Sequence, residues 1–252
     1  MTLVLITAGA KGIGYALAAA FAASGSEVWI TDIDKDALQS CPASWRKSCV
    51  DVANDAQMCA LFDEIAAVWG TVDVVCANAG VAGPTAKVEN VVWADWNTCV
   101  STTLGGAFLS AKYAAPLMKR AGKGALILIS STAGQYGYPN RAPYAAAKWG
   151  VIGLMKTLAM ELGPHGIRAN AICPGAVEGP RMEGVLTREA AAKNTTRDEV
   201  YQGYASGTSM GSFVTAQDIA NMAVFLGSDA ARLVSGQVIA VDGHTENPDP
   251  KI

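Results

Sequence analysis

The sequence has little charge and almost no histidine, and these shortages exclude several classes of protein. Only 16% of the 252 residues are charged, the net charge is −3, and no run of like charges occurs. Proteins that bind nucleic acid through its phosphates need an excess of Lys and Arg, so we expect no nucleic-acid partner. The two histidines, His165 and His244, are far apart and form no HExxH pattern, and no CxxC pair occurs. We therefore expect no metal site.

Long apolar runs are also missing. No run approaches the roughly 18 residues of a membrane span, so we expect no contact with a membrane. The first residues lack the positive region of a signal peptide. Cysteines stand at positions 41, 49, 59, 76, 99 and 173, with the spacing of neither a zinc site nor a disulfide scaffold. Single thiols in a reducing compartment fit this pattern, and we expect a cytoplasmic protein.

What the sequence does contain is an alternation of short apolar runs with helical patterns. It predicts strands over 3–6, 27–31, 47–52, 72–77, 125–130, 167–173 and 238–241, and helices over 15–23, 55–69, 95–119, 143–162 and 215–226. Asn54 would cap the second of these helices, and Thr215 with Asp218 would form a capping box on the last. This order predicts an α/β fold: a doubly wound, Rossmann-type parallel sheet with helices on both faces, as a single domain over 1–252.

One segment, from about 176 to 212, mixes Gly, charge and Ser/Thr with weak periodicity. Long irregular segments in compact domains are often binding loops or lids. We expect this segment to cover the substrate, although a surface excursion without function has the same pattern.

The first predicted strand runs directly into Gly9-Ala10-Lys11-Gly12-Ile13-Gly14 and then into a helix. Glycines there allow a tight turn and a close approach of backbone amides to a pyrophosphate, which the helix N-terminus also favours. A tight turn with no ligand is the alternative. Placed between a strand and a helix, the motif favours a dinucleotide site.

Asp32 ends the second predicted strand, 18 residues after Gly14. A carboxylate there accepts hydrogen bonds from the ribose of NAD and repels the extra phosphate of NADP, although it could instead cap the next helix. Lys11 favours NADP because a cation in the turn could pair with that phosphate. We give Asp32 the greater weight, because one exposed ion pair contributes little.

Tyr144 and Lys148 are four residues apart in a helical pattern and so share a face. A tyrosine with a pKa near 10 is a poor base at neutral pH, and a neighbouring ammonium favours its phenolate. Such a pair is common on surfaces, so its meaning depends on the other motifs.

Taken together, the motifs extend over nearly the whole chain: the Gly-rich turn, Asp32, Asp51-Val52, Asn78-Ala79-Gly80, Ser131, Tyr144-Ala145-Ala146-Ala147-Lys148, Pro174-Gly175 and Val241-Asp242-Gly243. In this order and spacing the chain resembles the short, single-domain branch of the short-chain dehydrogenase/reductase family.

The resemblance implies that Tyr144 is the general acid or base, that Lys148 lowers the pKa of Tyr144, and that Ser131 binds the substrate oxygen. It implies a cofactor groove formed by Gly9, Lys11, Gly12, Ile13, Gly14, Asp32, Ile33, Asp51, Val52, Asn78, Ala79, Gly80, Tyr144, Lys148, Pro174, Gly175 and Val177.

Three positions depart from the family pattern. Ala8 stands where the turn usually begins with Gly, which matters if that position needs a positive φ. Thr103 aligns with the Asn of the family's catalytic tetrad, and we keep it as a fourth catalytic candidate. Gly179 replaces a Thr that commonly contacts the carboxamide.

The substrate pocket of such a fold lies beyond the carboxyl ends of the strands, where we expect Gln135, Tyr136, Tyr138, Arg181 and Met182. Arg181 could clamp an anionic group of the substrate. An ion pair of Arg181 with Glu178 or Glu183 is the alternative.

We expect an NAD-dependent oxidoreductase that acts on a secondary alcohol, such as a small hydroxy acid or polyol, or on its ketone. The alternatives are an NADPH-dependent carbonyl reductase and a dinucleotide-binding protein without turnover. The family resemblance further implies a homotetramer, and Trp93, Trp96 and Trp149 lie on or near the helices that would pair, although core packing of one chain explains them equally well.

Overall fold

Seven parallel strands form one sheet in the computed structural model, which describes residues 1–247; residues 248–252 lie outside the described part. The strand order is β3-β2-β1-β4-β5-β6-β7, and every neighbouring pair is parallel. The strands are β1 (Leu3–Thr7), β2 (Glu27–Asp32), β3 (Arg46–Cys49), β4 (Val74–Ala77), β5 (Gly124–Ile129), β6 (Ile167–Pro174) and β7 (Val238–Val241). The order reverses direction between β1 and β4, which is where an open parallel sheet binds ligands. The predicted fold class is confirmed.

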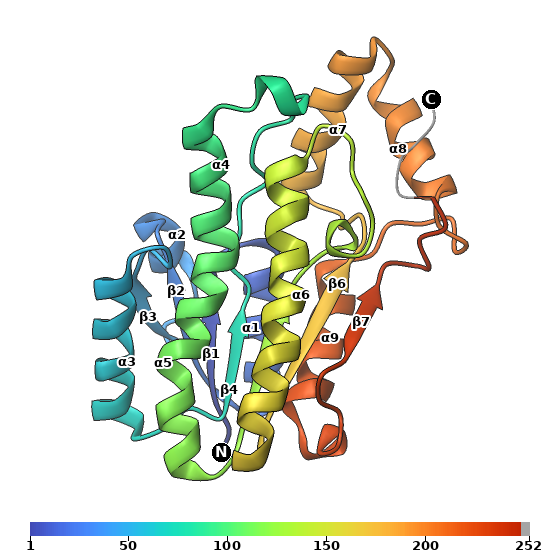
Figure 1. Ribbon diagram of the computed structural model, residues 1–252. Coiled ribbons are helices and arrows are strands. Elements are labelled where there is room, and N and C mark those ends of the chain that lie inside the picture. The colour runs from blue at the N-terminus through green and yellow to red at the C-terminus, as the bar shows by residue number, and fades with distance from the viewer. Residues whose placement is uncertain (248–252) are drawn as a thin grey trace.

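Helices cover both faces of the sheet (Figure 1). They are α1 (Gly12–Ala23), α2 (Lys35–Ser40), α3 (Asp55–Trp69), α4 (Trp93–Val100), α5 (Gly106–Ala121), α6 (Ala142–Leu162), α7 (Pro180–Lys193), α8 (Arg197–Ser206) and α9 (Ala216–Gly227). The predicted caps are present: the Asn54 side chain accepts from the Gln57 amide, and Thr215 and Asp218 form a capping box.

Two apolar layers hold the helices on the sheet. The first lies beneath α3, α5 and α6 and includes Met58, Leu117 and Met155, all fully or almost fully buried. The second lies beneath α1, α2 and α9 and includes Leu17 and Phe21. Because both faces of β1, β4 and β5 are buried, the sequences of these central strands are almost continuously apolar rather than alternating, which is why they could be recognised.

The helix predicted over 95–119 is wrong in one respect, because it is not continuous. α4 and α5 are joined by a turn of π-helix over Ser101–Gly105, which contains Thr103. Apolar periodicity hardly changes across one wider turn, so the sequence did not signal it. Such turns insert one residue into a helix and often lie at functional sites.

The segment predicted to be irregular, 176–212, contains two helices instead, α7 and α8. They stand beyond the carboxyl end of β6 (Figure 1). They pack around a small cluster of their own, formed by Leu186, Ala190, Val200, Ala205 and Phe213. Each helix needs only a few apolar residues to reach so small a cluster, which explains the weak periodicity. We call residues 176–214 the cap segment.

The turn between β1 and α1 contains a strained residue. Ala8 has φ +50°, in the left-handed region that disfavours a side chain, and Gly12 has φ +53°. Gly14 must be glycine for a different reason, since a Cβ there would overlap the carbonyl oxygen of Ala8. The chain therefore forms the turn with Ala8 in the backbone conformation that glycine adopts freely.

We expect Ala8→Gly to raise the free energy of unfolding by up to about 1 kcal/mol, because it removes the strain of a Cβ at positive φ. Ala10 lies in the same turn at negative φ, and Ala10→Gly serves as the control. It should lower stability by about 0.5–1 kcal/mol through the entropy of the unfolded chain. Urea unfolding of both variants measures the difference. Equal destabilisation by the two changes would contradict the account of strain at Ala8.

Candidate active site

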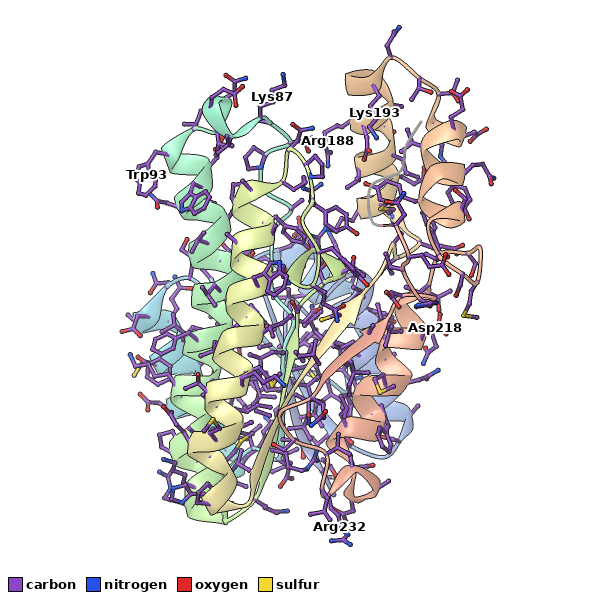
Figure 2. The ribbon with its side chains drawn as sticks, turned by 45° about the vertical axis from the view of Figure 1, so that its right-hand side comes forward. Lys87, Trp93, Arg188, Lys193, Asp218 and Arg232 are labelled. Atoms are coloured by element: carbon purple, nitrogen blue, oxygen red, sulfur yellow. The ribbon has the colours of Figure 1, made fainter. Side chains whose placement is uncertain are left out.

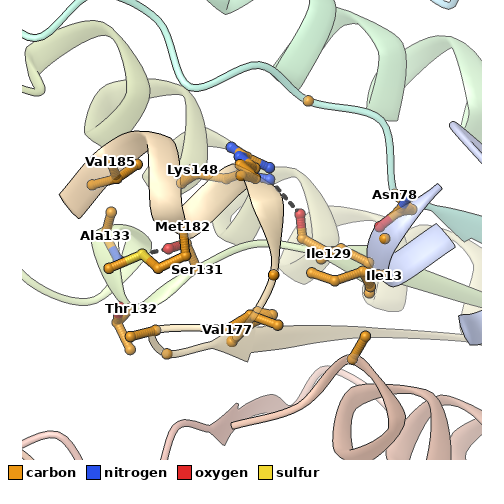
Figure 3. Close-up of a pocket in the computed structure, with 18 of the residues that line it drawn as sticks. Ile13, Asn78, Ile129, Ser131, Thr132, Ala133, Lys148, Val177, Met182 and Val185 are labelled. Atoms are coloured by element: carbon orange, nitrogen blue, oxygen red, sulfur yellow. Dashed lines mark hydrogen bonds between the residues drawn. The ribbon is translucent and has the colours of Figure 1, made fainter. Parts of the chain in front are cut away.

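A cleft of about 400 Å³ lies at the carboxyl ends of the strands. It runs from the turn before α1, through the ends of β4 and β5, to the start of α6 and the cap segment. Figure 3 shows Lys148 in this cleft, with Ile13 and Asn78 on one side and Ser131, Thr132 and Met182 on the other. The Gly-rich turn and the Tyr144–Lys148 pair, far apart in sequence, therefore line one cavity.

Asn78 ties the turn to the neighbouring strand. Its side-chain amide donates to the carbonyl oxygens of Thr7 (3.0 Å) and Ala8 (3.2 Å). The Thr7 hydroxyl in turn accepts from the backbone amides of Asn78 and Ala79, each at 3.0 Å. These bonds fix the position of the turn, and they hold Ala8 in its strained conformation.

The N-terminus of α1 opens into the cleft without a side-chain cap. Lys11 is the N-cap residue and makes no capping hydrogen bond, while Gly12, Ile13 and Gly14 line the cavity. The first amides of a helix have no intrahelical acceptor and carry a partial positive charge. This helix terminus therefore fits an anion such as a pyrophosphate.

Asp32 lines the same cleft at the end of β2. Its two oxygens accept from the amides of Ala10 (3.2 Å) and Asp34 (3.1 Å), which holds the carboxylate next to the turn. Lys11, the residue that favoured a 2′-phosphate, forms an ion pair with Asp34 at 2.6 Å. The carboxylate of Asp34 also caps α2 through the Ala37 amide.

Lys148 is buried, with only 3% of its surface exposed. Its ammonium donates to the carbonyl oxygen of Ile129 at 2.7 Å, at the end of β5. Gly80 passes so close that a Cβ there would lie 3.4 Å from the Lys148 Nζ. Burial lowers the pKa of Lys148, and the facing Tyr144 phenol partly opposes that shift.

Three cations surround the ring of Tyr144. The Arg141 Cζ, the Lys148 Nζ and the Arg181 Cζ lie 5.1, 5.7 and 5.8 Å from the ring centre. Burial alone raises the pKa of Tyr144, but Lys148, Arg181, the Ser131 hydroxyl and Arg141 outweigh it, and the net pKa is lowered. The site therefore favours a phenolate more than water does.

Ser131 and the start of α6 are positioned by short-range contacts. The Ser131 Oγ accepts from the Ala133 amide at 3.1 Å, in the 3₁₀ turn over Thr132–Gly134. Next to it, the buried Ser130 hydroxyl donates to the Lys148 carbonyl oxygen at 2.8 Å. Gly134 allows this approach, since a Cβ there would overlap the Ser130 Oγ.

Thr103 lies behind the cleft wall rather than in it. It is 1% exposed, and its hydroxyl accepts from the Val81 amide at 3.3 Å. A Cβ on Gly80 would lie 3.4 Å from both the Thr103 Oγ1 and the Lys148 Nζ, so all three residues meet. The π-helical turn places Thr103 at this junction.

The cap segment forms the far wall with Arg181, Met182, Val185 and Tyr204. The ion pair considered for Arg181 is absent: Glu183 pairs with Arg197, and no carboxylate within residues 1–247 forms an ion pair with Arg181. The Tyr204 hydroxyl donates to Glu189 at 2.8 Å, and together with burial this carboxylate raises the pKa of Tyr204.

Several residues singled out in the sequence lie outside the cleft wall. The predicted cofactor residues outside it are Gly9, Ile33, Asp51, Val52 and Ala79, and the predicted substrate residues outside it are Gln135 and Tyr136. The Tyr136 side chain is held outside the cleft wall, because its hydroxyl donates to the Thr245 carbonyl oxygen at 3.2 Å. The other predicted cofactor and substrate residues, including Tyr138, Pro174, Gly175 and Val177, line the cleft.

Sequence reasoning missed Arg141, Thr132, Glu178, Val185 and Tyr204, all of which line the cleft. Arg141 had a usable signal, because it stands three residues before Tyr144, one helical turn away. Val185 and Tyr204 had none, since their place depends on how α7 and α8 pack. Among residues 1–247, no group of three His, Cys, Asp or Glu side chains could hold a metal ion, and no helix is long and apolar enough to cross a membrane.

Comparison with known proteins gives consistent matches. A family profile described as enoyl-(acyl carrier protein) reductase matches residues 7–244. The chain is 35% identical to (+)-borneol dehydrogenase 1 from Salvia officinalis over 246 residues, which cover 95% of this chain and 91% of that protein.

Solved structures match equally well in fold. NAD⁺-bound xylitol dehydrogenase superposes with a TM-score of 0.93 at 26% identity, covering 96% of this chain and 98% of that one. ElxO with NADP bound superposes with a TM-score of 0.85 at 28% identity, covering 96% and 97%. These similar structures thus include one with each cofactor.

Proposed function

The chain belongs to the short-chain dehydrogenase/reductase family and is an oxidoreductase, and from this membership we propose that it transfers a hydride between a secondary alcohol and the nicotinamide ring of NAD. The observation that carries this proposal is the position of Lys148. Its buried ammonium, fixed on Ile129, faces Tyr144 in the same cleft as the uncapped N-terminus of α1.

The cleft fits a dinucleotide. At one end it offers the free amides of the α1 N-terminus to a pyrophosphate and the Asp32 carboxylate to a ribose. At the other end Gly175 lines the cleft with no side chain, and it packs so tightly on Asp242 that a Cβ there would lie 2.8 Å from that residue. We propose that Lys11, Gly12, Ile13, Gly14, Asp32, Asn78, Gly80, Pro174, Gly175 and Val177 hold the cofactor.

We propose that Tyr144 moves the proton of the reaction. When bound, the nicotinamide cofactor supplies the acceptor or donor of the hydride. In alcohol oxidation the Tyr144 phenolate takes the hydroxyl proton, and in ketone reduction the neutral phenol returns it. Lys148 stabilises the phenolate, and the Ser131 hydroxyl donates to the substrate oxygen.

Thr103 acts as a positioning residue in this proposal. It holds the Val81 amide and packs at Gly80, next to the Lys148 ammonium. A threonine is shorter than the asparagine of the family pattern, and the π-helical turn brings it to this junction.

NAD is favoured over NADP by the ion pair at the turn. Asp32 lines the cleft at the end of β2, and we expect its carboxylate to repel the 2′-phosphate of NADP. Lys11, the one cation of the Gly-rich turn, is held by Asp34 at 2.6 Å. An NADPH-dependent carbonyl reductase remains the second candidate, because releasing Lys11 from Asp34 would provide a phosphate partner.

Calorimetric titration should show NADH binding at least about tenfold more tightly than NADPH, as expected for one phosphate placed against a carboxylate. Asp32→Ser should reduce this preference. Asp34→Asn keeps an oxygen to cap α2 but loses the ion pair, so it should raise NADPH affinity by freeing Lys11. Tighter binding of NADPH by the unaltered chain would favour the second candidate.

Tyr144→Phe should lower kcat by at least about a hundredfold while leaving the NADH dissociation constant unchanged, because only the proton-transfer group is lost. In the unaltered enzyme, the rate of alcohol oxidation should rise with pH and level off below pH 10, since the pKa of Tyr144 is lowered. Lys148→Gln should move that rise to higher pH.

Tyr113→Phe is the matched control, since the hydroxyl of this half-buried tyrosine donates to Asp55 and neither residue lines the cleft. It should leave kcat unchanged. A Tyr144→Phe protein with nearly full activity would refute the role of Tyr144 and favour a dinucleotide-binding protein without turnover.

We also propose that the chain assembles as a homotetramer. Large apolar side chains are exposed on the outer helices: Trp93 at 72% on α4, Phe108 on α5, and Trp149 and Met160 on α6. Figure 2 shows Trp93 at the start of α4, pointing away from the ribbon. Such exposed groups favour association.

Light scattering should therefore give about four times the 26.0 kDa mass of one chain. Replacing Trp149 and Met160 with Glu should reduce that mass, because burying a carboxylate in an interface is costly. A monomeric mass for the unaltered protein would exclude the assembly.

A further inference from the structure

The proposed reaction uses one of the three cations around Tyr144 and leaves two without a role. Lys148 is needed to stabilise the phenolate. Arg141, the residue before α6, and Arg181, in the first turn of α7, approach the same ring at 5.1 and 5.8 Å. They come from different segments of the chain, Arg141 from the start of α6 and Arg181 from the cap segment.

Arg141 is partly buried, and not all of its guanidinium donors have hydrogen-bond partners. One of its terminal nitrogens donates to the Ala82 carbonyl oxygen at 3.2 Å. Its Nε is buried and has no hydrogen-bond partner. No carboxylate within the described residues forms an ion pair with it. A desolvated guanidinium without a counter-ion is costly unless a ligand supplies one.

Arg181 is exposed to the cleft and also has no carboxylate partner within residues 1–247. Its nearest candidate on α7, Glu183, is held by Arg197 of α8. The other nearby acid, Glu178, lines the cleft but is exposed and forms no ion pair with either arginine. The end of the cleft at Tyr144 therefore holds three cations against one solvated carboxylate.

We propose that Arg141 and Arg181 bind an anionic oxygen group of the substrate, a carboxylate or a sulfonate, so that the substrate is a small hydroxy or oxo acid. Both groups match the planar, two-pronged donor face of a guanidinium. The anion would lie within a few bonds of the reacting carbon, because both arginines flank the ring whose hydroxyl meets the substrate oxygen. This assignment rests on the proposed oxidoreductase function.

An anion bridging the two arginines also links the start of α6 to the cap segment. Arg141 is fixed beside the reacting tyrosine, while Arg181 is carried by α7. Substrates with the anion would thus contact both the start of α6 and the cap segment, and neutral alcohols would lack these charged contacts. The arrangement favours acids because they pair with the two arginines. It also disfavours neutral substrates, because these leave both guanidinium charges unpaired.

Two matched pairs of probes test the proposal by calorimetry: benzoate against benzamide, and benzenesulfonate against benzenesulfonamide. Each pair differs in charge and hardly in shape. We expect the unaltered chain, with NADH bound, to prefer the anion of at least one pair by about tenfold or more. The pair that shows the preference tells carboxylate from sulfonate recognition.

Arg181→Gln and Arg141→Gln should each reduce that preference to about threefold or less. Arg181 is exposed, so its variant should fold even if replacement of the half-buried Arg141 reduces stability. Arg188→Gln is the control, since Arg188 lies two turns further along α7 and outside the cleft wall (Figure 2). It should keep the preference of the unaltered chain.

Equal binding of anion and amide, or binding of neither, by the unaltered chain overturns the proposal. Equal binding would mean that the arginines act only on the Tyr144 phenol. The same titrations without NADH separate a failure of the proposed anion site from a failure of the proposed oxidoreductase function. Failure of NADH to bind rejects the oxidoreductase function, while an anion preference in the cofactor-free chain still supports the two-arginine site.

Discussion

The buried ammonium of Lys148 is the constraint on which the rest of the site depends. A cation that is 3% exposed needs hydrogen-bond acceptors, and the Lys148 ammonium donates to the carbonyl oxygen of Ile129 at the end of β5. That bond fixes α6 against the sheet. A second bond, from the Ser130 hydroxyl to the Lys148 carbonyl oxygen, holds the same turn of α6. Tyr144, one turn earlier, is thereby aimed into the cleft. The neighbouring charges then lower its pKa although burial opposes them.

Much of this could be predicted from the sequence because it depends on local patterns. Continuous apolar runs identified the strands, and the spacing of Tyr144 and Lys148 placed them on one helix face. What could not be predicted depends on contacts between distant segments. The π-helical turn at Thr103 changes no periodicity, and the pairing of Lys11 with Asp34 joins residues 23 positions apart.

The cap segment shows the same limit more clearly. Its helices carry few apolar residues, because they pack only on each other and on Phe213. The weak periodicity therefore predicts irregular structure, although the segment contains two helices. Arg181 was recognised as a candidate, but its freedom from Glu183 depends on Arg197, which lies on a different helix. Arg141 was overlooked although it stands one turn from the tyrosine.

The separate apolar cluster of the cap segment also has an evolutionary consequence. Leu186, Val200 and Phe213 are buried against each other, in a cluster separate from the two apolar layers that hold the helices on the sheet. Substitutions along the inner side of α7 therefore change one wall of the cleft without removing a side chain from the two layers that hold the sheet. The wall of the cleft and the sheet that carries Tyr144 and Lys148 are thus stabilised by separate sets of contacts, so one can change in sequence while the other keeps its packing.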